Sequence, residues 1–212
     1  RFCRVNRFNY AHSNITGGNF KYPYGKNYFE KCDFNKVSLT GFNSGDHTFK
    51  NCTFTDCSFM TLSGGVKIKF ENCVFRGTDM WNGWWTQNSN LTFHKCDIEV
   101  KDNLFLKLGA YGVGDVVIDS CKVTSKKDKG VIFCNIFDWR SSGGDKQPGS
   151  VTVKNSMFGP GIDHAVGTKD KGALSGKTKT TKKLTFTESN NKMASGKSAI
   201  GKMPEYGAKS KK

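Results

Sequence analysis

The sequence predicts an all-β protein, a single-stranded parallel β-helix of about seven to eight coils with stacked Cys and Phe ladders. Three observations predict this solenoid. A heptad recurs along the chain, and five cysteines occupy the same place in it. The apolar residues around those cysteines are β-branched or aromatic, as strands prefer. No helical period of 3.6 residues runs over a comparable length.

The repeat is clearest in five heptads, YFEKCDF, TFKNCTF, KFENCVF, TFHKCDI and VIDSCKV, with cysteines at positions 32, 52, 73, 96 and 121. Looser copies place Ser13, Ser156 and Ser189 in the same slot. The eight slots are separated by 19, 20, 21, 23, 25, 35 and 33 residues, so the period grows along the chain. A repeat of about 20 to 50 residues is typical of a solenoid or array.

Two apolar columns accompany the slot. Three residues before it stand Tyr10, Phe29, Phe49, Phe70, Phe93, Ile118, Val153 and Phe186. Two residues after it stand Ile15, Phe34, Phe54, Phe75, Ile98, Val123 and Phe158, and the pattern lapses at Asn191. We therefore expect each heptad to be a strand whose side chains stack on like residues of the next coil, about 4.8 Å away.

The five cysteines in the slot are predicted to form a core stack of free thiols, because cysteine is small and is often fully buried. Eight cysteines also allow a disulfide framework. However, stacked neighbours have nearly parallel Cα–Cβ directions, which suit a disulfide poorly. A zinc site is less favoured because no C-x2-C pair occurs. Cys3, Cys57 and Cys134 lie outside the ladder, and we expect Cys57 and Cys134 in second strands.

Two regions follow from this pattern: a β-helix over residues 1–166, and a Lys/Gly-rich C-terminal segment over 167–212 that includes a possible last coil at 184–191. The formal net charge is +15, and twelve lysines of the C-terminal segment face only Asp170, Glu188 and Glu205. This segment is either a solvated tail or a surface for an acidic polysaccharide, nucleic acid or virion partner. Specific nucleic-acid binding is not expected, because the tail lysines lack interleaved aromatics and arginine is scarce.

The ends and the apolar runs carry further expectations. No apolar run approaches the length of a membrane span of about 20 residues, so no span is predicted. The chain starts at Arg1 without Met, and an open β-helix end would expose strand edges. We therefore expect a piece of a longer protein.

The lengthening returns between heptads are the predicted ligand-binding region, because insertions in solenoids map to loops on one face. They cover residues 76–90, 101–115 and 137–149. The candidate ligand-binding residues are Trp81, Trp84, Trp85, Lys107, Tyr111, Trp139 and Arg140. Flat rings suit the C–H faces of sugars, and an arginine fork suits a carboxylate or sulfate. The alternative is that some of these rings pack beneath their own loops.

Catalytic candidates are few. Paired carboxylates could serve a glycosidase, and a basic residue near calcium-binding aspartates could serve a lyase, with Ca²⁺ as its cofactor. The candidates are Asp79, Asp102, Asp138 and Arg140, and Asp79 and Asp102 both lie six residues after their slots. The alternative is that these aspartates are solvated strand ends. Asp163 and His164, in GIDHAV, are expected to be structural, and no other metal site is predicted.

The repeated strands Asn51-Cys52-Thr53-Phe54 and Asn72-Cys73-Val74-Phe75 resemble the right-handed parallel β-helix proteins of the pectate-lyase-like superfamily. The resemblance covers residues 10 to about 160. The stretches VIFCNIFDWRSSGG and SVTVKNSMFGPG, with LTFTESNN and MPEYGAKS, further resemble secreted Bacteroidetes β-helix domains. A pentapeptide-repeat helix is a rival with coils of about 20 residues, but the later spacings of 23 to 35 argue against it.

The resemblance implies a right-handed helix and contact with polysaccharide, since the superfamily includes pectate lyases, polygalacturonases, alginate and chondroitin lyases and phage tailspikes. No catalytic residue can be transferred from it. The polygalacturonase segments NTD, DD, GHG and RIK are missing, as is the lyase segment R-x-P-x-x-R. GIDHAV is similar to the WIDH stretch of some pectate lyases, but it lacks the Trp.

Three functions remain open at this point. The first is a secreted or surface-exposed module that binds a polysaccharide, best matched by an anionic one, through an aromatic-lined lateral face. The second is an enzyme that cleaves such a polysaccharide. The third is a structural component of a tailspike or virion, as a homotrimer or larger assembly.

Overall fold

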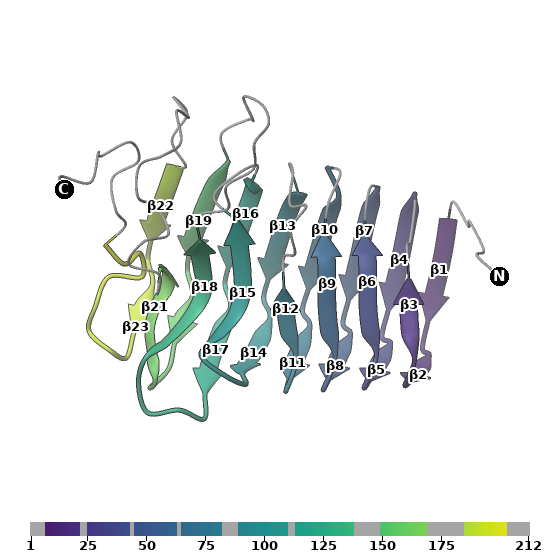
Figure 1. Ribbon diagram of the computed structural model, residues 1–212, viewed down its shortest axis with the longest axis horizontal. Helices are drawn as coiled ribbons and strands as arrows, with labels where there is room; N and C mark the ends of the chain where they lie inside the picture. The colour runs from purple at the N-terminus through teal and green to yellow at the C-terminus, as the bar shows by residue number, and fades with distance from the viewer. Residues whose placement is uncertain are drawn as a thin grey trace, which may run out of the picture.

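The chain winds into stacked coils in the computed structural model, and parallel sheets run along the long axis (Figure 1). The structure describes residues 7–21, 25–42, 45–62, 65–81, 89–109, 113–137, 149–168 and 185–202. Each described coil contributes a strand to sheet A, then to sheet B and then to sheet C, except the last, which contributes only to sheets A and B. Sheet A has eight strands in the described residues: β1 (Arg7–Ala11), β4 (Lys26–Glu30), β7 (Asp46–Lys50), β10 (Lys67–Glu71), β13 (Ser89–His94), β16 (Val113–Asp119), β19 (Ser150–Lys154) and β22 (Thr185–Ser189).

Sheets B and C follow the same order along the axis. Sheet B contains β2 (Asn14–Thr16), β5 (Asp33–Asn35), β8 (Thr53–Thr55), β11 (Val74–Arg76), β14 (Asp97–Val100), β17 (Lys122–Ser125), β20 (Met157–Phe158) and β23 (Lys192–Met193). Sheet C contains β3 (Asn19–Lys21), β6 (Ser38–Phe42), β9 (Ser58–Leu62), β12 (Asp79–Trp81), β15 (Leu104–Gly109), β18 (Val131–Phe137) and β21 (Ile162–Gly167).

Every strand pairs in parallel with its equivalents in the preceding and following coils. The register keeps like residues together, as in Phe49 opposite Phe70 and Phe70 opposite Phe93. It shifts between β13 and β16 and between β18 and β21, where the ladders are irregular. The predicted solenoid of stacked coils is therefore confirmed.

The corner between sheets A and B corrects the expected position of the heptad. In every described coil, the residue just before the slot has a positive φ between 52° and 57°. These residues are His12, Lys31, Asn51, Asn72, Lys95, Ser120, Asn155 and Asn190. The heptad thus ends one strand, turns a left-handed bend and begins the next strand, rather than forming one strand. Asn and short polar residues tolerate this conformation best, which explains why NC recurs.

The last coil also differs from the expected register. Val153 of β19 pairs with Glu188 of β22, and Phe186 pairs with Val151. The slot of this coil is therefore Asn191, not Ser189. Asn191 accepts a hydrogen bond from the Ser156 amide (3.1 Å) and donates to the Val153 carbonyl (2.9 Å). The column after the slot does not lapse, because Met193 pairs with Phe158.

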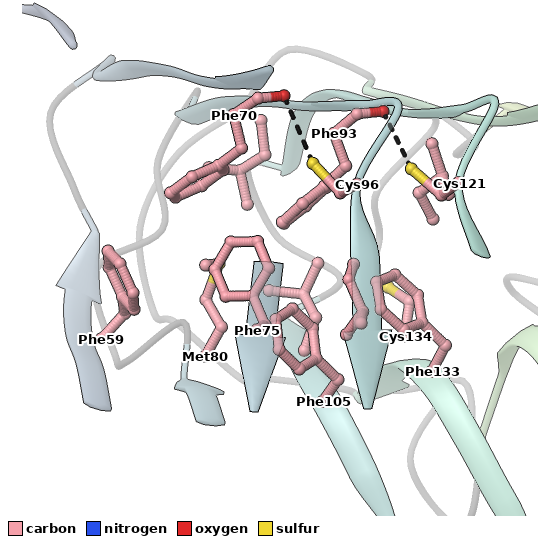
Figure 2. Close-up of a cluster of buried hydrophobic side chains, with 14 of the residues drawn as sticks. Phe59, Phe70, Phe75, Met80, Phe93, Cys96, Phe105, Cys121, Phe133 and Cys134 are labelled. Carbon is pink, nitrogen blue, oxygen red and sulfur yellow. Dashed lines mark hydrogen bonds between the residues drawn. The ribbon is translucent and has the colours of Figure 1, made fainter. Parts of the chain in front are cut away.

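The core is filled by columns of phenylalanines that stack from coil to coil. Phe29, Phe49, Phe70 and Phe93 lie ring over ring, with centroids 4.6 to 5.2 Å apart. A second column from sheet B meets it edge to face, as with Phe70 and Phe75 at 5.2 Å. Figure 2 shows Phe70, Phe75 and Phe93 converging on one interior with Phe59, Met80, Phe105 and Phe133. Both geometries are favourable for aromatic pairs, so one narrow core runs through the coils.

The predicted cysteine ladder is confirmed. Cys32, Cys52, Cys73, Cys96 and Cys121 are buried free thiols at successive corners. Each thiol from Cys52 onward lies near two carbonyl oxygens, one two residues earlier and one in the preceding coil, as Cys96 does with Phe70 (3.6 Å; Figure 2). A buried donor at the strand end thus finds an acceptor, and this satisfies the corner.

The cysteines outside the ladder divide between two positions, and Cys3 lies outside the described residues. Cys134 lies within β18, as expected of a strand position. Cys57 corrects the prediction, because it occupies the corner between β8 and β9 and not a strand. Its thiol donates to the Phe34 carbonyl (3.4 Å), so it repeats at this second corner the arrangement of the ladder. Burial raises the pKa of both Cys57 and Cys134.

A C-terminal cap, residues 194–202, folds over the last coil. Ile200 pairs with Val166 at the end of sheet C, and Ala199 is buried against the core. The Glu188 carboxylate, which occupies an inward column, accepts hydrogen bonds from the Ser198 hydroxyl and from the Ile200 amide at 3.0 Å. The cap therefore covers apolar ends that the last coil would otherwise expose.

Among the described residues, no helix is long and apolar enough to cross a membrane.

Candidate functional site

The candidate site lies at the edge of sheet C where β12, β15 and β18 end. Trp81 is the last residue of β12, and its register partner is Lys107 of β15, which in turn pairs with Asn135 of β18. Segments 82–88, 110–112 and 138–148 follow these three strands directly in the sequence. The three segments that carry the predicted aromatic residues therefore follow neighbouring strands at one edge of sheet C.

Most of the predicted ligand-binding residues belong to the segments that follow these strands. Trp84, Trp85, Tyr111, Asp138, Trp139 and Arg140 lie outside the described residues, and Trp81 is described for its backbone alone. Lys107 is half-buried between the fully buried Leu106 and Leu108, so its side chain lies on the outer face of sheet C. The structure thus brings two of the predicted residues, Trp81 and Lys107, to adjacent positions.

Asp79 begins β12, two residues before Trp81 on the same face of the sheet. Its amide donates to the Cys57 carbonyl (3.2 Å), which fixes the start of the strand. Its Oδ1 atom is buried, and no donor within the described residues reaches it. Burial raises the pKa of Asp79; the Lys101 charge opposes this shift and the Asp102 charge reinforces it.

Asp102 contributes from a different kind of position. It is exposed in the bend of residues 101–103 that precedes β15, outside the ladder of sheet C. The two aspartates therefore do not stack at equivalent strand positions as their equal distance from the slot had predicted. They still interact through their charges, and the pair combines a partly buried carboxyl with a solvated one.

Thr78 supports the strand that carries Asp79 and Trp81, and the sequence analysis missed it. It is fully buried at the corner before β12, in the position that Cys57 occupies one coil earlier. Its hydroxyl accepts a hydrogen bond from the Cys57 amide and lies 3.1 Å from the Phe54 carbonyl. Alignment of the repeat at this second corner would have revealed the equivalence of Cys57 and Thr78.

A charge column on the outer face of sheet A was also missed. It consists of Glu30, Lys50, Glu71, His94, Asp119 and Lys154, which are successive register partners. Lys50 lies 4.0 Å from Glu30, His94 lies 3.4 Å from Asp119, and Lys154 lies 3.6 Å from Asp119. Opposite charges directly across a ladder stabilise a sheet modestly.

Asp119 is the best connected member of this column. Partial burial acts to raise its pKa, but hydrogen bonds from Asn155 and Ser120 and the charges of Lys154 and His94 outweigh it and hold the pKa below its usual value. Asp119 is therefore ionised and engaged with its own neighbours. This column has the geometry of a structural feature rather than of a site.

Asp163 and His164 contact the C-terminal cap. Asp163 pairs with Lys197 (3.4 Å), and His164 Nδ1 lies 2.8 Å from the Ser198 carbonyl, so both hold the C-terminal cap, in line with the structural role expected of them. Across the described ranges, no three His, Cys, Asp or Glu side chains gather in a way that could hold a metal ion.

Comparison with known proteins adds one family. Residues 7–135, more than half of the chain, match the family model described as a right handed beta helix region. No curated protein matches the sequence. The matched range covers β1 to most of β18, and so includes the strands that end at the candidate site.

Proposed function

Because the protein belongs to the right-handed β-helix family, its coils repeat along one axis, and we propose that it binds a polysaccharide chain along the edge of sheet C. The best match is an anionic polysaccharide. A long repetitive polymer suits a solenoid, since each coil can offer an equivalent contact one strand spacing from the last.

The register of Trp81 with Lys107 is the observation that supports this proposal most directly. It places a tryptophan beside a half-buried lysine of the next coil. Aromatic rings pack on the C–H faces of sugars, and an ammonium group attracts a carboxylate or sulfate. The same edge continues into the segments with Trp84, Trp85, Tyr111, Trp139 and Arg140, which would extend the contact.

A glycan array with four proteins tests the proposal. We expect the wild type to bind one or more acidic polysaccharides, and the Trp81→Ala, Trp139→Ala double variant to lose most of that binding. Lys107→Ala should weaken binding to acidic glycans, whereas Lys67→Ala, which removes an exposed lysine from sheet A, should not. Indistinguishable profiles for all variants would reject the edge of sheet C as the binding site.

A polysaccharide-binding role also implies a location and an assembly. We propose that the protein acts where polysaccharides are exposed: outside the cell, on its surface or on a virion. Mass measurement in solution tests assembly, because a homotrimer would bury part of a lateral face. A trimer whose interface includes Lys107 would favour the structural role over glycan binding.

An enzyme that cleaves the polysaccharide is the second candidate function, and Asp79 favours it. A general acid needs a carboxyl that stays protonated at higher pH, and burial with a nearby carboxylate achieves this. Asp79 has both features and lies beside the proposed binding edge. Ca²⁺ is included in the assay because a lyase of this fold would use it.

Two readouts separate binding from cleavage. A hydrolase would release reducing ends from the bound glycan, and a lyase would release unsaturated sugars that absorb in the ultraviolet. We expect Asp79→Asn to abolish either product while leaving binding on the array intact. If the wild type binds but releases neither product, with and without Ca²⁺, the binding function is supported and the cleavage function is rejected.

A further inference from the structure

Sheet B carries a hollow on its outer face at the last coils, far from the edge of sheet C. Its volume is about 280 Å³, and carbon atoms make up most of its lining. It is lined by Lys122, Val123, Thr124, Met157, Phe158, Gly159, Lys192, Met193 and Ala194, from β17, β20, β23 and the residues that follow them. This size suits a single ring-shaped group at the lower end of ligand sites.

The hollow exists because one outward column changes from long side chains to short ones. Arg76 and Glu99 fill this column in the middle coils, and Thr124 follows. In the next two coils the column continues with Gly159 and Ala194, whose amides extend the ladder to Val123 and Phe158. The backbone therefore remains regular while the outer surface is hollowed.

Two lysines border the hollow. Lys122, Met157 and Lys192 are successive register partners, so the lysines lie two strand spacings apart, about 10 Å. Both are exposed, and neither side chain has an ion pair or hydrogen bond within the part of the chain that the structure describes. Met157 between them is 54% exposed, although large apolar side chains are usually covered.

We propose that this hollow binds a negatively charged sugar residue of an acidic polysaccharide. The ring would pack on Met157 above Gly159, and its anionic groups would face Lys122 and Lys192. Charge complementarity requires an anionic occupant. The chain's own residues 169–184 and 203–212 do not meet that requirement, because they carry nine lysines against Asp170 and Glu205.

A sugar fits better than an acidic peptide. Peptides that add to sheets use free backbone groups at an edge. This hollow lies on a sheet face, where the amides of Gly159 and Ala194 are already bonded to the preceding coil. The inference deepens the proposed function by adding a second contact for the same class of ligand, but it uses none of the residues of the first site.

The test measures binding of an oligogalacturonate hexamer, a heparin hexasaccharide, a neutral maltohexaose and a hexaglutamate peptide by calorimetry. We expect one or both acidic sugars to bind, with the preferred one distinguishing carboxylate from sulfate recognition. Lys122→Ser with Lys192→Ser should weaken that binding at least about tenfold. Lys26→Ser with Lys67→Ser is the matched control: these lysines are exposed, likewise two strand spacings apart, and lie on sheet A.

A filling variant separates the hollow from net charge. Gly159 does not have a positive φ, and a Cβ there would meet Thr124 at an ordinary 3.4 Å. Gly159→Leu should therefore keep the melting temperature while lowering affinity about tenfold, since the ring loses its space. Equal losses from the two lysine pairs, no effect of Gly159→Leu, equal binding of maltohexaose or hexaglutamate, or no binding of either acidic sugar would each overturn the inference.

The two sites can fail independently. If Trp81→Ala with Trp139→Ala abolishes glycan binding while Gly159→Leu does not, the edge of sheet C stands and the sheet B site falls. If Gly159→Leu weakens binding and the tryptophan variant does not, the sheet B site stands and the proposed edge falls.

Discussion

At the scale of single residues, each corner between sheets A and B places two unlike requirements side by side. The first position needs a left-handed backbone and faces solvent, so it takes Asn, Lys, Ser or His. The second must fit into the core and donate a hydrogen bond to a strand end. Cysteine meets both needs of the second position in five coils, Ser156 does so with its hydroxyl, and Asn191 does so with its amide.

This division predicts the response to changes at Cys73. Its thiol lies 3.3 Å from the Phe49 carbonyl and 3.4 Å from the Glu71 carbonyl. Cys73→Ala removes a buried donor and leaves a small void, so we expect unfolding to become easier by about 1–2 kcal/mol. Cys73→Ser should cost less, because the hydroxyl can donate as that of Ser156 does. Urea denaturation measures both, and a larger loss for Ser than for Ala would contradict this account.

Asp79 predicts a pH-dependent stability. Burial raises its pKa in the folded state, so the folded protein holds this proton more tightly than the unfolded chain. The ionised carboxylate therefore destabilises the fold above its folded-state pKa, and the penalty fades as pH falls toward the ordinary value of about 3.9. We expect Asp79→Asn to melt at a higher temperature than wild type at pH 7, with the difference shrinking at acid pH. A lower melting temperature at pH 7 would show that the carboxylate stabilises the fold.

At the scale of elements, sheet A is held on its outer face by alternating charges and on its inner face by stacked rings. The charge column runs from Glu30 to Lys154, and opposite charges are neighbours along Glu30, Lys50 and Glu71 and again at Asp119 and Lys154. His94 is the member that can carry no charge, and it lies between Glu71 and Asp119. The residue at position 94 therefore decides whether positive and negative charges alternate along the whole column.

A charge reversal at His94 tests this column. His94→Glu would align three carboxylates on adjacent strands, and like charges directly opposite destabilise a sheet by about 0.2–1 kcal/mol per pair. We expect a lower melting temperature in dilute buffer, with partial recovery at about 1 M salt, where the screening length is only about 3 Å. His94→Lys preserves the alternation and should match or exceed wild type. Equal melting of both variants would show that the column contributes nothing.

The sequence was sufficient to predict the coils but not every register. The phenylalanine and cysteine columns predicted the solenoid because a ladder requires like residues at like positions. The last slot was misplaced by two residues, from Asn191 to Ser189. A shift of two keeps every side chain on the same face of a strand, and Phe186 resembles the aromatics of the neighbouring column. Only the partner strand distinguishes the two registers.

The candidate site was less predictable for a related reason. The pairing of Trp81 with Lys107 depends on how many residues each corner inserts, and the corner before β15 has lengthened to residues 101–103. The hollow at Gly159 depends on small residues, Gly159 and Ala194, at equivalent positions of two successive coils. Neither feature gives a periodic signal in one repeat, so both required the register of the assembled sheets.

At the scale of the whole molecule, the C-terminal cap ends the stack of coils. Glu188 stands where other coils place Phe, Ile or Val in the inward column, and its carboxylate is held by Ser198 and Ile200. A further coil stacked here would bury that charge, which is costly without a partner. The residue that anchors the cap is therefore also the one that opposes continuation of the ladder.

Substitution of Glu188 should loosen the C-terminal cap without loosening the other coils. The amides of Val166 and Gly201 are bonded between sheet C and the cap. We expect Glu188→Ala to speed their hydrogen exchange at least about tenfold while leaving the amides of β10 unchanged, because local openings near an end need not unfold the core. Glu99→Ala, which removes the half-buried partner of Lys126 in the middle of the solenoid, is the control. Unchanged exchange at Val166 would show that the cap is held by Ala199 and its apolar contacts.

The described strands pair only with those of the adjacent coils, so no β-ladder joins the first coil to the last. A force that pulls the two ends of the chain apart would therefore not be resisted by any one set of strand pairs. The coils would unfold one at a time. In the short early coils, each step would release about 20 residues, or roughly 70 Å of extended chain. The longer coils toward Met193 would release longer segments, so the chain length released in each step would show which end of the solenoid had unfolded.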